Sequence, residues 1–307
     1  MRIAVVGAGG VGGYYGGLLA AAGEDVGFIA RGAHLEAMRV EGLRVSDRQR
    51  DIHLAPTRAT DDPAEIGPVE VVLFCVKLYD TEAAAGLLTP LLGSETILVP
   101  LQNGVDSAER LAGFVAADRI LPGAAWLYAH VAEPGVVRCI SEKSGIVFGE
   151  SDGSRSARAR RFAEACARAG IEAKLSTEIE KEIWSKFAQL ASNAAISTLS
   201  RLNLYHVYRH PELRPLVEAA MVEAVAVATA KGIDLDADLI PRTMAAARGF
   251  QPDLTNSMHN DLKAERRLEV AHLSGHIARL GDALGVPVPI HRAAWAALKP
   301  FAEGRPG

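Results

Sequence analysis

The sequence predicts an α/β protein in which a doubly wound parallel sheet is followed by an all-α C-terminal domain. Three observations support this fold class. A glycine-rich turn follows a short apolar strand at the start of the chain, strand and helix patterns alternate through the first half, and only helical patterns follow about Thr177. Alternating strands and helices are typical of parallel sheets that are covered by helices.

Four apolar runs predict the parallel strands. Residues 2–6 are a short run rich in β-branched side chains, residues 25–30 are a second short strand, and residues 69–76 and 96–100 are nearly continuous apolar runs. Continuous runs of this length are typical of strands that are buried on both faces. Helical patterns are interspersed with these strands. The first follows the glycine-rich turn and ends at Gly23, and two others cover residues 80–92 and 106–114.

The pattern changes after residue 124. Strand-like runs at 126–131, 136–140 and 146–149 predict antiparallel additions to the sheet, and a helix at 156–169 and a strand at 172–176 follow. The later helical patterns cover residues 180–200, 211–231, 236–247, 257–284 and 290–302. We therefore expect two domains, 1–178 and 179–307, and a mobile polar tail at 303–307.

The composition argues against several classes of protein. The 307 residues carry 33 Lys and Arg against 37 Asp and Glu, so there is no cationic excess for binding nucleic acid or an anionic membrane. Three scattered cysteines are too few for a disulfide framework or a zinc site. No stretch is apolar enough to span a bilayer, and the N-terminal glycines would interrupt a signal peptide. We expect a cytoplasmic protein without a bound metal.

A G-x-G-x-x-G motif follows the first strand and opens a helix. It consists of Gly7, Ala8, Gly9, Gly10, Val11 and Gly12. In this context the first glycine allows a tight turn, the second lets the backbone approach a pyrophosphate, and the third lets helix and strand pack closely. The helix N-terminus offers N–H groups to the phosphates. The motif therefore predicts a dinucleotide site in a Rossmann-type domain.

The end of the second strand indicates which dinucleotide is bound. Sites for NAD usually place Asp or Glu there, against the ribose 2′-hydroxyl. Here the chain reads Phe28-Ile29-Ala30-Arg31-Gly32 and has no carboxylate at the strand end. Because a guanidinium pairs bidentately with phosphate, Arg31 favours NADPH. The alternative is an ordinary solvated surface arginine.

Five segments have the order and spacing of a known family. They are GAGGVGGYYG at 7–16 with ARG at 30–32, VKLYDT at 76–81, LQNGVD at 101–106, IWSKF at 183–187, and NSMHNDL with LEVAHLSG at 256–262 and 268–275. With these segments the chain resembles the ketopantoate reductases (2-dehydropantoate 2-reductases) from end to end. The resemblance implies NADPH as hydride donor, reduction of a 2-keto acid to the 2-hydroxy acid, and a role in pantothenate synthesis. It leaves open whether the protein forms a homodimer.

The resemblance assigns catalysis to Lys186 and Glu269. Lys186 matches the family's catalytic lysine, and Glu269 matches the acidic residue that binds the substrate hydroxyl and orients the lysine. Hydride addition to a ketone develops negative charge on oxygen, and a lysine whose pKa is lowered by burial can protonate it. The alternative is a lysine on a solvated helix face. We expect Ser257, Asp261, Glu265 and Glu269 to form an i, i+4 ladder along one helix.

Three further residues match binding positions of the family. Ser257 can hydrogen-bond the substrate carboxylate, although a helix N-cap is the alternative. Asn103, in the LQNG turn after a strand, can hold both the substrate and the nicotinamide ribose. Lys77 follows the strand at 69–76 and matches a lysine near the cofactor and substrate; the alternative is a solvent-facing lysine.

The substrate region departs from the family. Classical members often carry asparagines where this chain has Leu190, Ala194 and Leu254, and leucine cannot replace an amide that recognises a polar substrate. Asn193, seven residues after Lys186, lies on nearly the same helical face and is a candidate replacement. The alternative for Asn193 is a role in helix packing.

The leading hypothesis is NADPH-dependent reduction of 2-dehydropantoate to pantoate, with Lys186 as the general acid. One alternative keeps the chemistry and changes the substrate to another small 2-keto acid. Another is a non-catalytic NADP-binding regulator, which would not need the residues for catalysis. A metal enzyme is disfavoured because the two H-x-x-x-H pairs, His206 with His210 and His272 with His276, lack a third ligand at a recognisable spacing.

Overall fold

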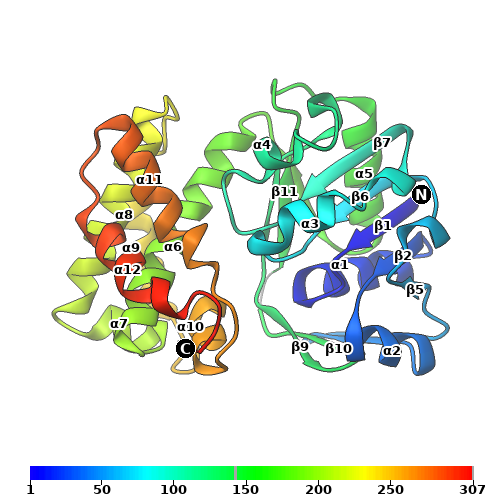
Figure 1. Cartoon of the computed structure of the whole chain (residues 1–307), viewed down its shortest axis with the longest axis horizontal. Helices are drawn as coiled ribbons and strands as arrows, with labels where there is room; N and C mark the ends of the chain where they lie inside the picture. The colour runs from blue at the N-terminus through cyan, green and yellow to red at the C-terminus, as the bar shows by residue number, and fades with distance from the viewer. Residues whose placement is uncertain (142–143, 306–307) are drawn as a thin grey trace. The chain divides into compact units, whose positions relative to one another are not determined.

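The computed structural model describes residues 1–141 and 144–305 (Figure 1). The chain forms two compact units, Met1–Glu182 and Ile183–Gly307. The division falls inside helix α6 (Ile179–Ser200), close to the boundary at residue 178 that the sequence suggests. The assignment of separate roles to the two domains stays a prediction.

The first unit is built on a parallel sheet of five strands. In spatial order these are β5 (Ala59–Thr60), β2 (Asp25–Ile29), β1 (Arg2–Val6), β6 (Val69–Phe74) and β7 (Leu92–Pro100). Val5 pairs with Phe28 on one side and Leu73 on the other. The predicted doubly wound α/β fold is confirmed, and the strand order reverses at β1, which is where such sheets bind ligands.

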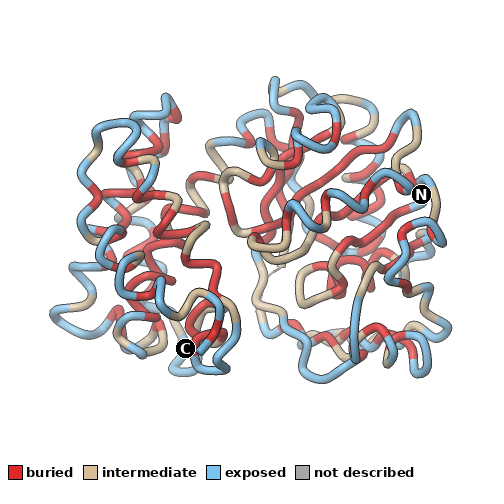
Figure 2. The backbone as a smooth tube through the Cα atoms, viewed as in Figure 1, coloured by how far each residue is buried: buried red, intermediate tan, exposed pale blue. Residues whose placement is uncertain are grey.

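Successive residues of the central strands enter different cores on the two faces of the sheet. Ile3 and Val5 belong to one apolar cluster, and Ala4 and Val6 belong to another. All four are nearly or fully buried, as the red strands of Figure 2 show. Because side chains alternate between the faces, a strand covered on both sides needs an apolar residue at every position. This is why these strands were visible in the sequence.

The helices of the first unit lie on both faces of the sheet. They are α1 (Gly10–Ala21), α2 (Gly32–Val40), α3 (Thr81–Ala85), α4 (Ser107–Leu111) and α5 (Ala157–Arg168), with 3₁₀ turns η1 (Pro63–Glu65), η2 (Leu78–Asp80), η3 (Thr89–Leu91) and η4 (Ala117–Arg119). The predicted helices at 80–92 and 106–114 are much shorter than expected. Pro90 lacks the N–H that a continuous helix would need, so the chain passes through a short 3₁₀ turn instead.

The remaining strands form two further sheets. One has the order β4 (Asp51–Leu54), β3 (Leu43–Ser46), β10 (Val136–Cys139), β9 (Ala129–Glu133), and the other β12 (Glu172–Leu175), β11 (Gly145–Phe148), β8 (Gly123–Trp126). The prediction that they extend the central sheet is therefore wrong. The physical reason is the β3–β4 hairpin, not foreseen from the sequence, which gives β10 its own parallel partner.

The second unit is helical. After α6 come α7 (Leu204–Arg209), α8 (Leu213–Ala230), α9 (Leu239–Ala246), α10 (Ser257–Lys263), α11 (Ser274–Leu284) and α12 (Pro289–Leu298), with 3₁₀ turns η5 (Ala247–Gly249), η6 (Glu269–Ala271) and η7 (Lys299–Phe301). Its described residues, 183–305, contain no strand, as expected. No helix in the described part of the chain is long and apolar enough to cross a membrane.

The prediction of one helix over residues 257–284 is wrong, and so is the ladder drawn along it. Helix α10 ends in a Schellman motif: the N–H of Arg266 donates to the Asp261 carbonyl at 2.8 Å, and that of Glu265 donates to the Leu262 carbonyl at 3.1 Å. Glu265 adopts the left-handed conformation, with φ of 54°. The chain therefore turns before Glu269, which begins η6 instead of continuing α10.

The described residues of the polar tail form ion pairs with an earlier part of the chain. Glu303 pairs with Arg267, and Arg305 pairs with Glu265. These ion pairs connect the tail to the segment that follows α10, and the mobility of the tail stays a prediction. Residues 306 and 307 lie outside the described part.

The contact between α1 and β1 yields a test of the fold. A Cβ atom at Gly12 would overlap the Gly7 carbonyl oxygen and lie 2.8 Å from Val5 Cγ1, whereas one at Gly9 would meet nothing within 4 Å. Gly12→Ala should lower the free energy of unfolding by about 1–3 kcal/mol, the usual cost of overpacking. Gly9→Ala is the matched control and should unfold like the wild type. Urea unfolding measures both, and equal stabilities would show that the packing argument is wrong.

Candidate functional site

The glycine turn lies between β1 and α1, at the carboxyl edge of the parallel sheet. Gly7 has φ of 93°, and its N–H donates to the Ile29 carbonyl at 3.1 Å, which joins the turn to β2. The first N–H groups of α1 have no partner within the helix. Because no atom lies within 4 Å of the Cβ position at Gly9, a ligand can approach the backbone there. These features fit a pyrophosphate.

The structure gives Gly10 a role that the motif alone does not reveal. A Cβ atom at Gly10 would overlap the carbonyl group of Ala129 in β9. Val11, next to it, is partly buried and packs against the core on that side of the sheet. Gly10 therefore allows β9 to cross closely over the start of α1. At Gly9 no atom of the described residues blocks the approach of a ligand to the backbone.

His34 was missed in the sequence and braces the turn. Its Nε2 donates to the Ala8 carbonyl at 2.8 Å, and its Nδ1 accepts from the Gly135 N–H at 3.0 Å. These bonds require the neutral ring, and burial lowers the pKa of His34 in agreement with this. A lone histidine on a helix carries no sequence signal for such a role.

Arg31 follows β2 at the N-terminus of α2, and its side chain is 82% exposed. Its Nη2 lies 2.6 Å from Oδ2 of Asp80, whose carboxylate is mostly buried. The sequence places no carboxylate at the end of β2, yet η2 supplies one from the loop after β6. The motif VKLYDT contains this residue, but nothing in a linear pattern indicates that it faces Arg31.

Lys77 and Asn103 lie at the same edge of the sheet. Lys77 precedes η2 after β6, and Asn103 follows β7 in the next turn. Between these loops, the buried amide of Gln102 donates to the Val76 carbonyl at 3.0 Å and to Thr81 Oγ1 at 2.9 Å. Because the carboxyl ends of parallel strands share one edge, four of the predicted positions (the glycine turn, Arg31, Lys77 and Asn103) follow neighbouring strands.

The second unit brings Lys186 and Glu269 together. Lys186 lies on α6, and Glu269 begins η6 with a side chain that is 4% exposed. Burial lowers the pKa of the Lys186 amine to about 8, while the nearby Glu269 carboxylate acts in the opposite direction. The expected helix ladder does not form, but the two groups meet because η6 returns towards α6.

Ser257 is the exposed first residue of α10 and does not cap it. The cap is Asn256, whose Oδ1 accepts from the His259 N–H at 2.9 Å. The amide of Asn256 also donates to Ser197 Oγ, and His259 Nδ1 lies 3.1 Å from the Ser197 carbonyl oxygen. These contacts fix α10 against α6 and leave the Ser257 side chain outside the cap.

Asn193 is buried in α6, where its Oδ1 accepts a hydrogen bond from the Tyr208 hydroxyl at 2.8 Å. This contact fits a role in helix packing. Nearby, Leu254 packs beside an apolar cluster that includes Tyr208, and its carbonyl accepts from the Leu204 N–H at 2.9 Å. A role for Asn193 in substrate binding stays a prediction.

The residues described by the structure contain no group of three or more His, Cys, Asp or Glu side chains that could hold a metal ion. His276 belongs to one of the two histidine pairs noted in the sequence. Its ring packs edge-on against the Phe187 ring, with centroids 6.4 Å apart.

Comparison with known families covers nearly the whole chain. Residues 3–153 match the family described as Ketopantoate reductase PanE/ApbA, and residues 178–302 match its C-terminal domain. The chain belongs to the ketopantoate reductase family. It is therefore an oxidoreductase of this family, and the resemblance found in its motifs is confirmed.

Individual relatives extend over the same length. The 2-dehydropantoate 2-reductase of Archaeoglobus fulgidus is 31% identical, with 95% of this chain and 94% of the relative covered. The PanE/ApbA family ketopantoate reductase of Ralstonia eutropha JMP134 has a structure with TM-score 0.90 and 31% identity, covering 98% of both chains. D-mandelate dehydrogenase, solved with NADH and anilino(oxo)acetate, shares the fold at TM-score 0.89 and 22% identity, again over 98% of both chains.

The Lys186–Glu269 pair makes a prediction about titration. Only a neutral amine reacts with an acylating reagent, so the labelling rate of Lys186 should rise with pH around a midpoint of about 8. In Glu269→Gln the midpoint should fall, because the carboxylate stabilises the ammonium form. Peptide mass spectrometry after pulsed labelling measures this, with the exposed Lys263 as an internal reference. A midpoint that rises in Glu269→Gln would contradict the assigned interaction.

Proposed function

We propose that this family member reduces 2-dehydropantoate to pantoate with NADPH, as a step in pantothenate synthesis, and that Lys186 is the general acid. The observation that carries the proposal is the amine of Lys186, whose pKa is lowered to about 8, beside the buried Glu269 carboxylate. At neutral pH such an amine is mostly protonated and still gives up its proton more readily than an exposed lysine. The names of the full-length relatives support the substrate.

The proposed reaction is a hydride transfer followed by a proton transfer. The cofactor, when bound, supplies a hydride to the carbonyl carbon of the keto acid. The electron pair of the C=O double bond then moves to the oxygen, which takes a proton from the Lys186 ammonium group. Lys186 regains that proton from solvent, so one keto acid, one hydride donor and one proton give one hydroxy acid. Glu269 holds the ammonium in place and keeps enough of it protonated, and Ser257 is assigned to the substrate carboxylate.

Residues of the first unit fit a dinucleotide. The open backbone at Gly9 and the N-terminus of α1 suit the pyrophosphate, and Asn103 and Lys77 are assigned to the nicotinamide side. Arg31 suits a 2′-phosphate and supports NADPH. Its partner Asp80 acts against a phosphate, because a carboxylate 2.6 Å from the guanidinium would repel the added negative charge. The preference for NADPH should therefore be moderate.

A second candidate is reduction of another small 2-keto acid. The specific observation in its favour is the loss of amides at Leu190, Ala194 and Leu254, together with the engagement of Asn193 Oδ1 by Tyr208. A pocket with fewer amides would suit a less polar substrate. The non-catalytic regulator is disfavoured, since a sensor would have no use for a half-buried lysine beside a buried glutamate. A cytoplasmic location stays a prediction from the sequence, and homodimeric assembly stays open.

A Lys186→Ala variant tests the function. Its kcat should fall by about 10²–10⁴, the usual contribution of general-acid catalysis, while NADPH binding stays nearly unchanged. Lys263→Ala, at an exposed lysine of α10, is the matched control and should keep wild-type kcat. Both are assayed with 2-dehydropantoate and with a panel of small 2-keto acids. Near-normal turnover in Lys186→Ala would exclude the mechanism, and a much higher kcat/KM for another acid would favour the second candidate.

The Arg31–Asp80 pair makes opposite predictions for its two members. Arg31→Ala should weaken NADPH relative to NADH by about tenfold to a hundredfold, because a charge-assisted bond to the phosphate is lost. Asp80→Asn should strengthen NADPH relative to NADH, because the repulsion is removed. Arg39→Ala, at another arginine of α2 with its own partner Asp61, should change neither affinity. Fluorescence titration measures the dissociation constants, and equal changes for both cofactors would remove the assignment.

A further inference from the structure

The C-terminal residues 302–305, here called the tail segment, hold the chain just before Glu269. The Leu268 N–H donates to the Ala302 carbonyl at 2.9 Å. The guanidinium of Arg267 meets the Glu303 carboxylate, with Nε 2.8 Å from Oε2. Two consecutive residues that lead into η6 are therefore attached to two consecutive residues of the tail segment.

The other half of the tail segment holds Glu265. Arg305 Nη2 lies 2.7 Å from Glu265 Oε1. Gly304 is buried with φ of 106°, and a Cβ atom there would lie 2.8 Å from the Glu265 carbonyl oxygen. Only glycine fits both this conformation and this close approach. The tail segment thus packs against the residue whose left-handed conformation ends α10.

These contacts matter because the held residues belong to neither α10 nor η6. Ala264 is the C-cap of α10, and Leu268 is the N-cap of η6. Within this link, the Schellman bonds at Glu265 and Arg266 and the ion pair of Arg266 with Asp261 fix the start. The tail segment holds the rest of the link, at Arg267 and Leu268.

The same end of the chain also contacts the residue that follows α6, the helix that carries Lys186. The guanidinium of Arg201, just after α6, lies 5.7 Å from the centre of the Phe301 ring. The match to the family's C-terminal domain ends at residue 302, so Glu303, Gly304 and Arg305 lie beyond the matched domain.

We propose that the tail segment positions the Glu269 carboxylate beside the Lys186 amine, with Glu303 and Arg305 as positioning residues. The inference rests on the proposed function, in which Lys186 donates the proton. Losing the tail contacts would loosen the link before η6 and let the carboxylate move away from the amine. Because that carboxylate stabilises the ammonium form, the pH above which turnover declines would then fall.

Other charged or titratable groups are present on the elements around this pair, and the test must separate their effects. His272 directly follows η6, and α11 and α12 carry His276, Arg279, Asp282, His291 and Arg292. His291 is fully buried and hydrogen-bonded to the Ala220 carbonyl, and burial lowers its pKa to about 4, so it is neutral throughout the range tested. Arg279 donates to the Ala271 carbonyl at 3.0 Å. His272 and His276 are unchanged in every variant and contribute equally.

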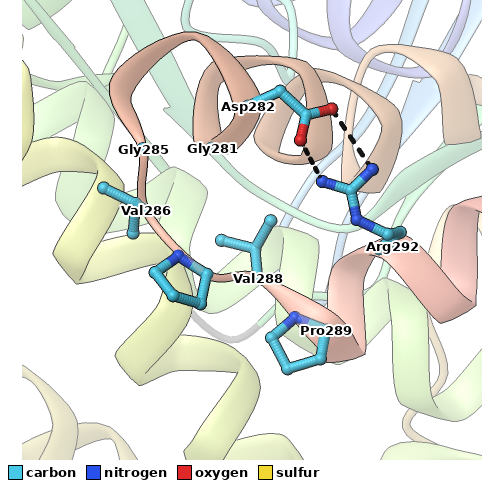
Figure 3. A pocket seen from close by; sticks show the side chains of 8 residues that line it. Gly281, Asp282, Gly285, Val286, Val288, Pro289 and Arg292 are labelled. Carbon is cyan, nitrogen blue, oxygen red and sulfur yellow. Dashed lines mark hydrogen bonds and ion pairs between the residues drawn. The ribbon is translucent and has the colours of Figure 1, made fainter.

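The test is a Glu303→Gln/Arg305→Gln double variant, followed by kcat, KM and pH profiles. We expect kcat to fall about threefold to tenfold, a part of the roughly 10²–10⁴ that general-acid catalysis provides. The KM for NADPH should stay unchanged, and the descending limb of the profile should move to lower pH. Asp282→Ala is the matched control, because it removes an exposed two-bond ion pair with Arg292 in the same unit (Figure 3). That variant should keep the wild-type kcat and profile.

Two further variants decide the interpretation. In a Glu269→Gln background the double variant should change nothing more, because the tail would act only through that carboxylate. Exchanging the charges, Arg267→Glu with Glu303→Arg, should restore kcat relative to Glu303→Arg alone. If Glu269→Gln alters the profile but the double variant does not, the role of the tail is refuted and the proposed function stands. If Glu269→Gln leaves kcat and the pH profile unchanged, the role of the tail segment and the proposed function are both refuted.

Discussion

An ammonium group that is taken out of water is costly unless a carboxylate lies near it, and the helical unit satisfies this requirement with parts distant in sequence. Lys186 comes from α6 and Glu269 from η6. For the two to meet, α10 must end early and the chain must turn, which it does through the left-handed Glu265 and the bonds around it. The capped start of α10, anchored to Ser197 by Asn256, fixes the other side of that turn. Much of this unit's irregular backbone thus serves one charge pair.

The first unit meets a different requirement, which is to leave backbone N–H groups accessible beside a tightly packed sheet. Glycine solves both parts in one turn: Gly12 lets α1 lie against β1, and Gly9 leaves its outer side open. Side chains outside the glycine turn then hold the carboxyl edge of the parallel sheet in place. His34 holds the turn through the Ala8 carbonyl, and Gln102 joins the loops after β6 and β7. A ligand would therefore meet a surface whose shape is set before it binds, which lowers the entropy cost of binding.

The parts that could be predicted are those in which the physical cause is local or repeated. The central strands are apolar at every position because both faces are covered, and the glycine motif follows one of them directly. The β3–β4 hairpin was missed because each strand has four residues and one exposed face. The end of α10 was missed because its left-handed residue is glutamate, where glycine would have signalled a stop. The pairing of Asp80 with Arg31 joins loops 49 residues apart, and no linear pattern records such a contact.

The crossing of β9 over Gly10 constrains how this sequence can evolve. The atoms that would collide with a side chain at position 10 are the carbonyl group of Ala129 and the N–H of His130, which belong to the main chain. A substitution at position 129 or 130 leaves those atoms where they are, so no second-site exchange in β9 can compensate for a change at position 10. Relief would require the strand itself to shift, for example by an insertion or deletion in the β9–β10 turn. That turn contains Gly135, whose N–H is bonded to His34, so such a length change would also remove the brace of the glycine turn. We therefore expect the glycine turn and the β9–β10 turn to change together during evolution or to stay unchanged.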